Sequence, residues 1–249
     1  MIILKTPHEI ERMKVPCQIV AETLELLRQK IRPGITTSAL DQIAERQAGK
    51  SNATPAFKGY SGYPFSLCCS VNDQVVHGFP TTEELRPGDI LSIDFGVVYD
   101  GFYGDAAITV AVGSVSTEAL ALIKVTEEAL YKGIEKATAI NHLSDISSAV
   151  QCHAEKSGFS VVREFVGHGI GRSLHESPQV PNFGKPGRGV KLKPGMVLAI
   201  EPMINQKGPG VKVLSDGWTA VTLDGGLSAH FEHTVAITES GPQILTVFS

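Results

Sequence analysis

The chain has 249 residues, of which 42% are hydrophobic and 19% are charged, and its formal net charge is -4. This length and this hydrophobic content suffice for one large domain or two fused halves. This balance gives no sign of a nucleic-acid-binding surface, and no apolar run approaches the length of a membrane span. The opening residues are too few for a signal peptide, and the four cysteines include no Cys-x-x-Cys pair, so a cytoplasmic protein with reduced thiols is expected.

The first predicted element is a helix that begins at Pro7. Thr6 can cap this helix, and Glu9, three residues later, completes a capping box. Apolar residues then recur every three or four positions, which is typical of one buried helical face. Pro16 interrupts that face and predicts a kink or a new start. The helix is expected to stop at residues 32–34, Arg-Pro-Gly.

Three further helices are expected, over about residues 38–48, 117–137 and 144–156, the last of them ended by Gly158. Short runs rich in β-branched residues and punctuated by glycine and proline lie between and after these helices. The chain is therefore expected to contain both helices and strands.

Residues 93–107, IDFGVVYDGFYGDAA, form a predicted hairpin with an acidic residue in each strand. Asp94 follows an apolar run, the chain turns at Asp100-Gly101, and Asp105 opens the next apolar strand. An unpaired charge in such a setting costs several kcal/mol, or its pKa moves until the group is neutral. Asp100 is interpreted as a turn residue, whereas Asp94 and Asp105 need a compensating partner.

The two halves of the chain repeat this pattern. LRPGDILSIDF at 85–95 matches LKPGMVLAIEP at 192–202 position by position, and the match pairs Asp94 with Glu201. In both halves the matched strand follows a pair of predicted helices. The repeat therefore predicts two related units, each with a carboxylate near the end of its first strand.

A second carboxylate also recurs, because Asp105 and Glu232 each open a strand of threonine and aliphatic residues. One unit alone cannot cover the apolar face of its sheet, so two units would pack around a pseudo-two-fold axis. The chain is therefore expected to be a single domain, 1–249, built from halves of about 1–112 and 113–249. Four carboxylates would then converge near the axis.

Four carboxylates share an apolar site as anions only when positive charge joins them, and two divalent cations would balance this set. The four are Asp94, Asp105, Glu201 and Glu232. His168, in the glycine-rich GHGIGR, is the natural fifth ligand. One imidazole with four carboxylates favours Mn, Fe, Co or Zn over Mg or Ca, and the lack of a cysteine ligand excludes a closed structural zinc site. Two such ions would form a hydrolytic centre that binds and deprotonates a water.

Each of these residues, taken alone, has an ordinary structural interpretation. A lone aspartate at a strand end is usually a turn former. Glu201 before Pro202 suits an edge strand, Glu232 could pair with a neighbouring histidine, and His168 could be a hydrogen-bonded core residue. Their placement at matched repeat positions is what favours the metal centre.

The motifs DFG followed by GDAA, VGHGIGRSLHE, LAIEPM and HFEHTV resemble those of the type I methionine aminopeptidases without an amino-terminal extension. The resemblance covers nearly the whole chain. It implies the duplicated α+β pita-bread fold also found in creatinase and prolidase, a curved antiparallel sheet covered by two pairs of helices with internal pseudo-two-fold symmetry. It also implies a cytoplasmic hydrolase that removes the initiator methionine from nascent proteins and peptides, with a preference for a small second residue.

The resemblance further implies a role for each ligand. Asp94 would chelate one ion and His168 would bind the other, while Asp105 and Glu232 would bridge both. Glu201 would bind the ion held by His168 and also act as the general base for the nucleophilic water. The two divalent ions would be Co, Mn, Fe or Zn.

Substrate contacts follow from the same resemblance. His77, in VVHGFP, matches a histidine that contacts the scissile amide, and His175, in SLHE, matches one that hydrogen-bonds the scissile carbonyl. The free α-amino group of the substrate would bind the ion held by Asp94. Residues that match the methionine side-chain pocket are Tyr60, Tyr63, Cys68 and Trp218.

Two positions depart from the family pattern. Leu174 stands where the family often has phenylalanine, and Phe57 stands where a small residue or cysteine is common. Both would border the pocket, so the substrate preference and the rate are left open. The expected partner is a peptide or nascent chain with a free amino-terminal methionine; the ribosome is a further candidate partner, and a monomer is the default assembly.

Three alternatives share parts of this pattern. Xaa-Pro dipeptidases and aminopeptidases of the same fold carry a substantial amino-terminal domain, whereas the catalytic unit expected here starts almost at Met1. A non-catalytic pita-bread binding protein should lack a ligand, and all five are present. Type II methionine aminopeptidases insert a helical subdomain between the histidine and the first glutamate, but only 33 positions separate His168 from Glu201.

Overall fold

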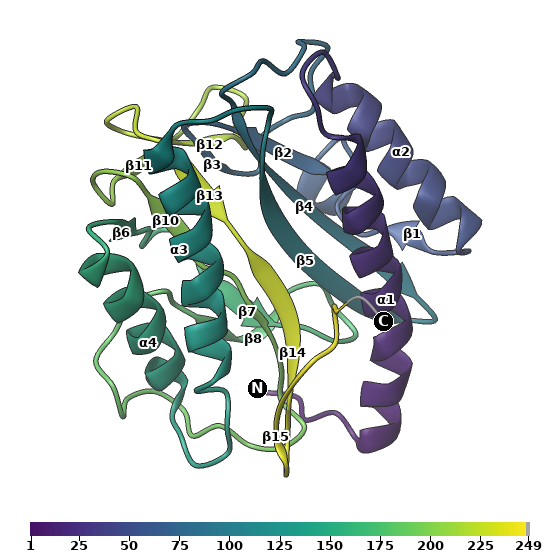
Figure 1. Cartoon of the computed structure of the whole chain (residues 1–249). Helices are drawn as coiled ribbons and strands as arrows, with labels where there is room; N and C mark the ends of the chain where they lie inside the picture. The colour runs from purple at the N-terminus through teal and green to yellow at the C-terminus, as the bar shows by residue number, and fades with distance from the viewer. Residues whose placement is uncertain (248–249) are drawn as a thin grey trace.

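The computed structural model describes residues 1–247 and shows two pairs of helices on one curved sheet (Figure 1). The α-helices are α1 Pro7–Lys30, α2 Thr37–Lys50, α3 Thr117–Ile134 and α4 Leu143–Lys156, and a 3-10 turn, η1, spans Tyr60–Gly62. Helices α1 and α2 cover one half of the sheet, and α3 and α4 cover the other half (Figure 1). The last two residues of the expected second half, 248 and 249, lie outside the described residues.

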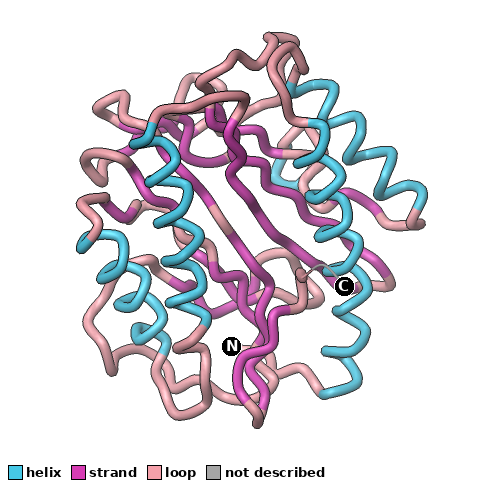
Figure 2. Tube along the Cα trace, viewed as in Figure 1, coloured by secondary structure: helices cyan, strands magenta, loops and turns pink. Residues whose placement is uncertain are grey.

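The largest sheet has nine strands, and its main path runs in the order β1-β4-β5-β14-β9-β7-β8, with β2 paired to β4 and β15 paired to β14. Its strands are β1 Thr54–Pro55, β2 Cys68–Val71, β4 Ile90–Tyr99, β5 Phe102–Ala111, β7 Gly167–Gly169, β8 Glu176–Val180, β9 Val197–Ile200, β14 Glu232–Thr238 and β15 Gly241–Ile244. Every pairing described within it is antiparallel. The α+β class with an antiparallel sheet and four covering helices is therefore confirmed (Figure 2).

Two small sheets flank the main one. The first pairs β13 (Ser228–His230), β10 (Met203–Asn205) and β6 (Ser160–Val161), and the second pairs β11 (Val211–Val213), β12 (Ala220–Thr222) and β3 (Gln74–Val76). Among residues 1–247, no helix combines the length and the apolar character needed to cross a bilayer.

The predicted start of α1 is confirmed. The Glu9 amide donates to Thr6 Oγ1 at 3.2 Å, and the Thr6 amide donates to Glu9 Oε2 at 2.9 Å. The new helix start considered at Pro16 is wrong, because α1 runs unbroken through this residue. Gly104 of β5 packs directly on this turn, since a Cβ there would lie 2.8 Å from the Pro16 carbonyl carbon. The helix therefore continues through Pro16 with β5 packed closely against it.

The hydrophobic core lies between the helices and one face of the sheet, and the other face of the sheet points away from the helices. On β4, Ile93 and Phe95 belong to the apolar cluster of α1 and α2, and on β9, Leu198 and Ile200 belong to the cluster of α3 and α4. Successive side chains of a strand point to opposite faces. Asp94, between Ile93 and Phe95, therefore faces away from the helices.

A buried ion pair ties the amino-terminal segment to the loop after β7. Lys5 Nζ contacts Glu176 Oε2, and the two side chains are only 4% and 6% exposed. The other oxygen, Glu176 Oε1, accepts from the amides of Arg172 at 2.8 Å and Ser173 at 3.3 Å. Glu176 therefore links the amino terminus to the loop that carries His175.

Lys5→Met is expected to lower the free energy of unfolding by about 3–5 kcal/mol, because it leaves a buried carboxylate without its partner. Denaturant unfolding of the wild type and the variant measures this loss, and the double variant Lys5→Met/Glu176→Gln should recover part of it. Lys14→Met is the control, since Lys14 forms an exposed pair with Glu11 and should cost less than about 1 kcal/mol. Equal losses for the two lysine variants would contradict a structural role for the buried pair.

Candidate metal centre and active site

Strand register brings the first three predicted ligands together. Asp94 of β4 pairs with Ala107 of β5, and Ala107 pairs in turn with Glu232 of β14. Directly paired residues share one face of a sheet, so Asp94 and Glu232 lie on either side of Ala107 on that face. Asp105 precedes Ala107 by two positions and therefore points the same way.

A neighbouring row of the sheet supplies the other two ligands. His168 of β7 pairs with Ala199 of β9, and Ala199 pairs with Thr234 of β14. Thr234 lies two residues after Glu232, so this row shares the face of the first. Glu201 lies two residues after Ala199 and continues on that face as β9 ends. All five predicted ligands therefore converge away from the helices.

The hairpin of β4 and β5 is built to admit these side chains. Asp100 and Gly101 have φ angles of 49° and 75°, the combination that a tight two-residue hairpin turn requires. Gly96, opposite Asp105, leaves room for the site: a Cβ there would lie 3.0 Å from Asp105 Oδ1 and 2.9 Å from Phe57 Cε1. A side chain at position 96 would thus displace either a ligand or the wall of the cavity.

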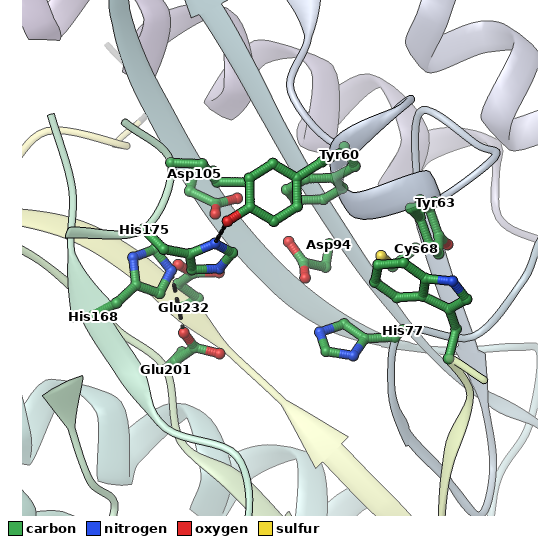
Figure 3. Close-up of a pocket in the computed structure, with 13 residues that line it drawn as sticks. Tyr60, Tyr63, Cys68, His77, Asp94, Asp105, His168, His175, Glu201 and Glu232 are labelled. Carbon is green, nitrogen blue, oxygen red and sulfur yellow. Dashed lines mark hydrogen bonds and ion pairs between the residues drawn. The ribbon is translucent and has the colours of Figure 1, made fainter. Parts of the chain in front are cut away.

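The converging residues line one cavity of about 590 Å³, part of it open to solvent (Figure 3). The lining includes all twelve candidate site residues from the sequence, together with Phe57. They are Tyr60, Tyr63, Cys68, His77, Asp94, Asp105, His168, Leu174, His175, Glu201, Trp218 and Glu232. Figure 3 shows Asp94 between the two histidines His168 and His175 on one side and Tyr63 and Cys68 on the other, with Asp105, Glu201 and Glu232 grouped around the histidines.

Burial dominates the electrostatics of the acidic residues. Asp105 and Glu232 are 4% and 2% exposed, and burial raises the pKa of each well above its ordinary value. Burial also raises the pKa of Asp94 to about 7 and that of Glu201 to about 8. Without added positive charge, this cluster therefore keeps protons at a pH where ordinary carboxyl groups are ionised.

Several of these groups fit a divalent cation. Asp94 Oδ1, Asp105 Oδ1 and Glu232 Oε1 are buried and have no hydrogen-bond partner among the described residues. Asp105, His168 and Glu232 each offer a ligand atom within 4.8 Å of the others, and so do Glu201, His230 and Glu232. The donor set combines carboxylate oxygens with imidazole nitrogen, which suits a transition metal or zinc.

His168 is oriented as a ligand. Its Nδ1 lies 2.9 Å from the Gly169 carbonyl oxygen, which assigns the ring proton to Nδ1 and leaves the Nε2 lone pair free. Nε2 lies 3.5 Å from Glu201 Oε1, inside the cavity. Burial and the nearby His175 lower the pKa of His168 to about 3, so the ring is neutral and able to bind a cation.

His230 is a residue of this centre that the sequence analysis missed. It is 1% exposed at the end of β13, and its Nε2 lies 3.5 Å from Glu201 Oε2. A signal was present, because His230 precedes Glu232 by two positions and extended residues two apart share a face. The internal repeat gives no such signal, because the corresponding position in the hairpin of the first half holds Tyr103.

Two further histidines reach the cavity from loops. His175 Nδ1 shares a hydrogen bond of 2.7 Å with the Tyr60 hydroxyl, and its ring centroid lies 4.3 Å from that of His168. His77 has a φ of 60°, an uncommon conformation that turns its side chain toward the cavity. Burial lowers the pKa of His77 to about 4 and also lowers that of His175, so both rings are neutral near pH 7.

An apolar compartment adjoins the acidic cluster beside Asp94. Cys68 of β2 pairs with Asp94, and Tyr63 holds its place by donating to the Leu67 and Gly78 carbonyls, each at 3.1 Å. The Trp218 ring meets the Tyr63 ring edge-on at 5.0 Å. Phe57 and Leu174, the two departures from the family pattern, are 8% and 2% exposed and form part of the same wall.

Comparison with known proteins places this geometry in a family. The sequence pattern of metallopeptidase family M24 matches residues 11–239. A methionine aminopeptidase of Clostridium perfringens is 60% identical over 99% of both chains, and methionine aminopeptidase 1 of Bacillus subtilis is 54% identical over 99% of both.

Solved structures agree with the sequence matches. The crystal structure of methionine aminopeptidase from Thermotoga maritima has a TM-score of 0.97 and 49% identity, and covers 99% of this chain and 100% of that one. The prolidase of Pyrococcus horikoshii shares the fold with a TM-score of 0.81 at 22% identity, but this chain spans only 64% of its length. The chain belongs to metallopeptidase family M24 and, within it, to the methionine aminopeptidases.

Proposed function

We propose that this chain is a dinuclear, metal-dependent aminopeptidase that removes the amino-terminal methionine from peptides and nascent proteins, with a preference for a small second residue. The observation that carries the proposal is the convergence of five metal-ligating side chains on one sheet face, beside an apolar compartment in the same cavity. Family membership and 60% identity to a methionine aminopeptidase support it.

The ligands divide between two ions in this proposal. Asp94 would hold one ion, His168 and Glu201 would hold the other, and Asp105 and Glu232 would contribute to both. The buried acceptors without a hydrogen-bond partner at three of these residues support this assignment. When bound, divalent ions of the Co, Mn, Fe or Zn type supply Lewis acidity and lower the pKa of water.

The remaining chemistry belongs to side chains of the chain. Glu201 accepts the proton of the attacking water, because its carboxylate lines the cavity beside His168 and the positive charge of the bound ions keeps it ionised. His175 donates a hydrogen bond to the scissile carbonyl oxygen as negative charge develops there, and Tyr60 orients the ring. His77 contacts the scissile amide on the other side of the cavity.

The apolar compartment selects the first residue of the substrate. Tyr63, Cys68, Leu174 and Trp218 surround a space suited to a thioether, with Tyr60 at its mouth and Phe57 behind. Aromatic edges and a sulfur atom make favourable contacts with a methionine side chain. The placement of Cys68 directly beside Asp94 brings this compartment next to the ion that would meet the α-amino group.

The wider assignments follow from the same proposal. The domain is one catalytic unit made of two related halves, about 1–112 and 113–249, whose paired carboxylates, Asp94 with Glu201 and Asp105 with Glu232, build the centre jointly. The enzyme works in the cytoplasm as a monomer on chains with a free amino-terminal methionine. Contact with the ribosome is a further part of the proposal, because nascent chains are presented there.

A paired peptide assay tests the proposed function. The purified protein, loaded in turn with Co, Mn, Fe or Zn, should release methionine from Met-Ala-Ser and leave an Xaa-Pro dipeptide and an amino-terminally acetylated Met-Ala-Ser intact. The blocked peptide is the control for dependence on a free amine. Cleavage of the Xaa-Pro peptide with Met-Ala-Ser left intact would instead assign a dipeptidase of the same fold.

A further inference from the structure

His230 is a buried imidazole that the mechanism above does not use. Its backbone is fixed, because its amide donates to Thr109 Oγ1 at 2.9 Å and the Thr109 hydroxyl donates to its carbonyl at 2.8 Å. Its ring nitrogen Nε2 is buried and has no hydrogen-bond partner among the described residues. A carboxylate lies close to that nitrogen, since Glu201 Oε2 is 3.5 Å away.

The Glu201 carboxylate thus lies between two imidazoles that differ in their surroundings. On one side, His168 lines the cavity, and its Nδ1 bond to Gly169 leaves Nε2 free of a proton. On the other side, the described lining of the cavity includes Glu201 but not His230. His230 therefore approaches Glu201 Oε2, whereas His168 approaches Oε1.

We propose that His230 is a positioning residue whose Nε2–H donates a hydrogen bond to Glu201 Oε2 and holds Oε1 toward the reacting water. This inference rests on the proposed function, in which Glu201 is the base. A general base must present its accepting oxygen within hydrogen-bond reach of the water, and a small misplacement costs a large part of its contribution.

The distance is consistent with this role. A charge-assisted N–H···O bond is about 2.7–2.9 Å long, so a movement of less than an ångström closes the contact. Catalytic hydrogen bonds are commonly longer in the free enzyme and shorten in the substrate complex. The strand pairing of His230 with Met203 of β10 fixes the backbone that carries the ring.

A second assignment, direct ligation of an ion by His230, has to be separated from this one, because Glu201, His230 and Glu232 offer ligand atoms within 4.8 Å of one another. The two assignments differ in the proton on Nε2. A positioning residue carries a proton on that nitrogen, whereas a ligand presents its lone pair to the ion.

Kinetics of three variants test the positioning role. His230→Leu removes the donor and should lower kcat by about 10–100-fold while KM stays within about twofold of the wild type. His230→Gln supplies an amide N–H and should recover most of the lost kcat. His233→Gln is the matched control and should leave kcat unchanged, since this ring bonds Thr246 and Tyr131 outside the cavity. Wild-type kcat in His230→Leu would overturn the proposal.

Nuclear magnetic resonance of the zinc-loaded protein with ¹⁵N-labelled histidine gives a readout independent of activity. The His230 Nε2 signal, assigned by its absence in His230→Gln, should show an attached proton that exchanges slowly with solvent. An unprotonated Nε2 would overturn the proposal and favour ligation. The peptide assay tests the proposed function separately, because an inactive wild type would refute aminopeptidase activity while the proton on Nε2 still reports the contact.

Discussion

Removal of the divalent ions is expected to abolish peptide hydrolysis and to destabilise the protein, with the larger destabilisation above pH 7. The ions supply the charge that lets four buried carboxylates ionise together, and without them the carboxylates must either keep protons or repel one another. The free energy of metal binding at this site therefore also stabilises the folded state.

The sign of the pH dependence follows from the raised pKa values. Burial raises the pKa of Asp94 from 3.8 to about 7 and that of Glu201 from 4.5 to about 8. At pH values between the ordinary pKa and the raised pKa of each group, the metal-free folded state binds more protons than the unfolded chain does. The contribution of both groups to the free energy of unfolding is complete below their ordinary pKa values and is lost as the pH rises through 7 and 8.

Thermal midpoints of chelated and metal-loaded protein at pH 5.5 and pH 8.5 measure this effect. The difference between the two forms should be larger at pH 8.5, where the ions compete with fewer protons. The metal-free double variant Asp94→Asn/Asp105→Asn is the control and should lose less stability between the two pH values than the metal-free wild type. Equal midpoints with and without metal at pH 8.5 would refute the role assigned to the ions.

Glu201→Gln is expected to lower kcat on Met-Ala-Ser by about 10²–10⁴-fold, the usual contribution of a general base. The substitution preserves the shape of the side chain and an oxygen for ligation, but the amide cannot take a proton from water. Because the loss lies in proton transfer, KM should change much less than kcat. Steady-state kinetics with metal content determined for each preparation provide the measurement.

Two controls accompany this variant. Glu239→Gln, in the exposed turn between β14 and β15, should retain the wild-type rate. Metal-free Glu201→Gln should also be at least as stable as the metal-free wild type at pH 8.5, because one buried acid with a raised pKa has been removed. A wild-type rate in Glu201→Gln would show that the base has been wrongly assigned.

Local chemistry accounts for the parts of the fold that were predicted correctly. The capping box of Thr6 and Glu9 defines the start of α1 because its two hydrogen bonds involve residues only three apart. The predicted spans of α2 and α4 agree with the structure within about two residues, while α3 ends at Ile134, before the expected residue 137. The Asp100-Gly101 turn was likewise evident, because positive φ angles at both positions favour these two residue types.

Long-range packing explains the errors. Pro16 does not restart α1, which runs on as one helix with Gly104 of β5 packed closely against this turn, and helix propensity alone does not describe such tertiary packing. His230 was missed because its partner, Glu201, is 29 residues away in sequence and reaches it only through the pairing of β10 with β13.

The sequence by itself predicted the four carboxylates of the candidate site, because alternation along a strand and the internal repeat act on residues near one another or at matched positions. Only the tertiary structure decided how these side chains meet. The row from Asp94 through Ala107 to Glu232, the approach of His168 to Glu201 and the contact of Tyr60 with His175 all join segments far apart in the chain. Their geometry depends on the register between strands, which is set by the burial of the apolar face of the sheet against the helices and not by any local spacing.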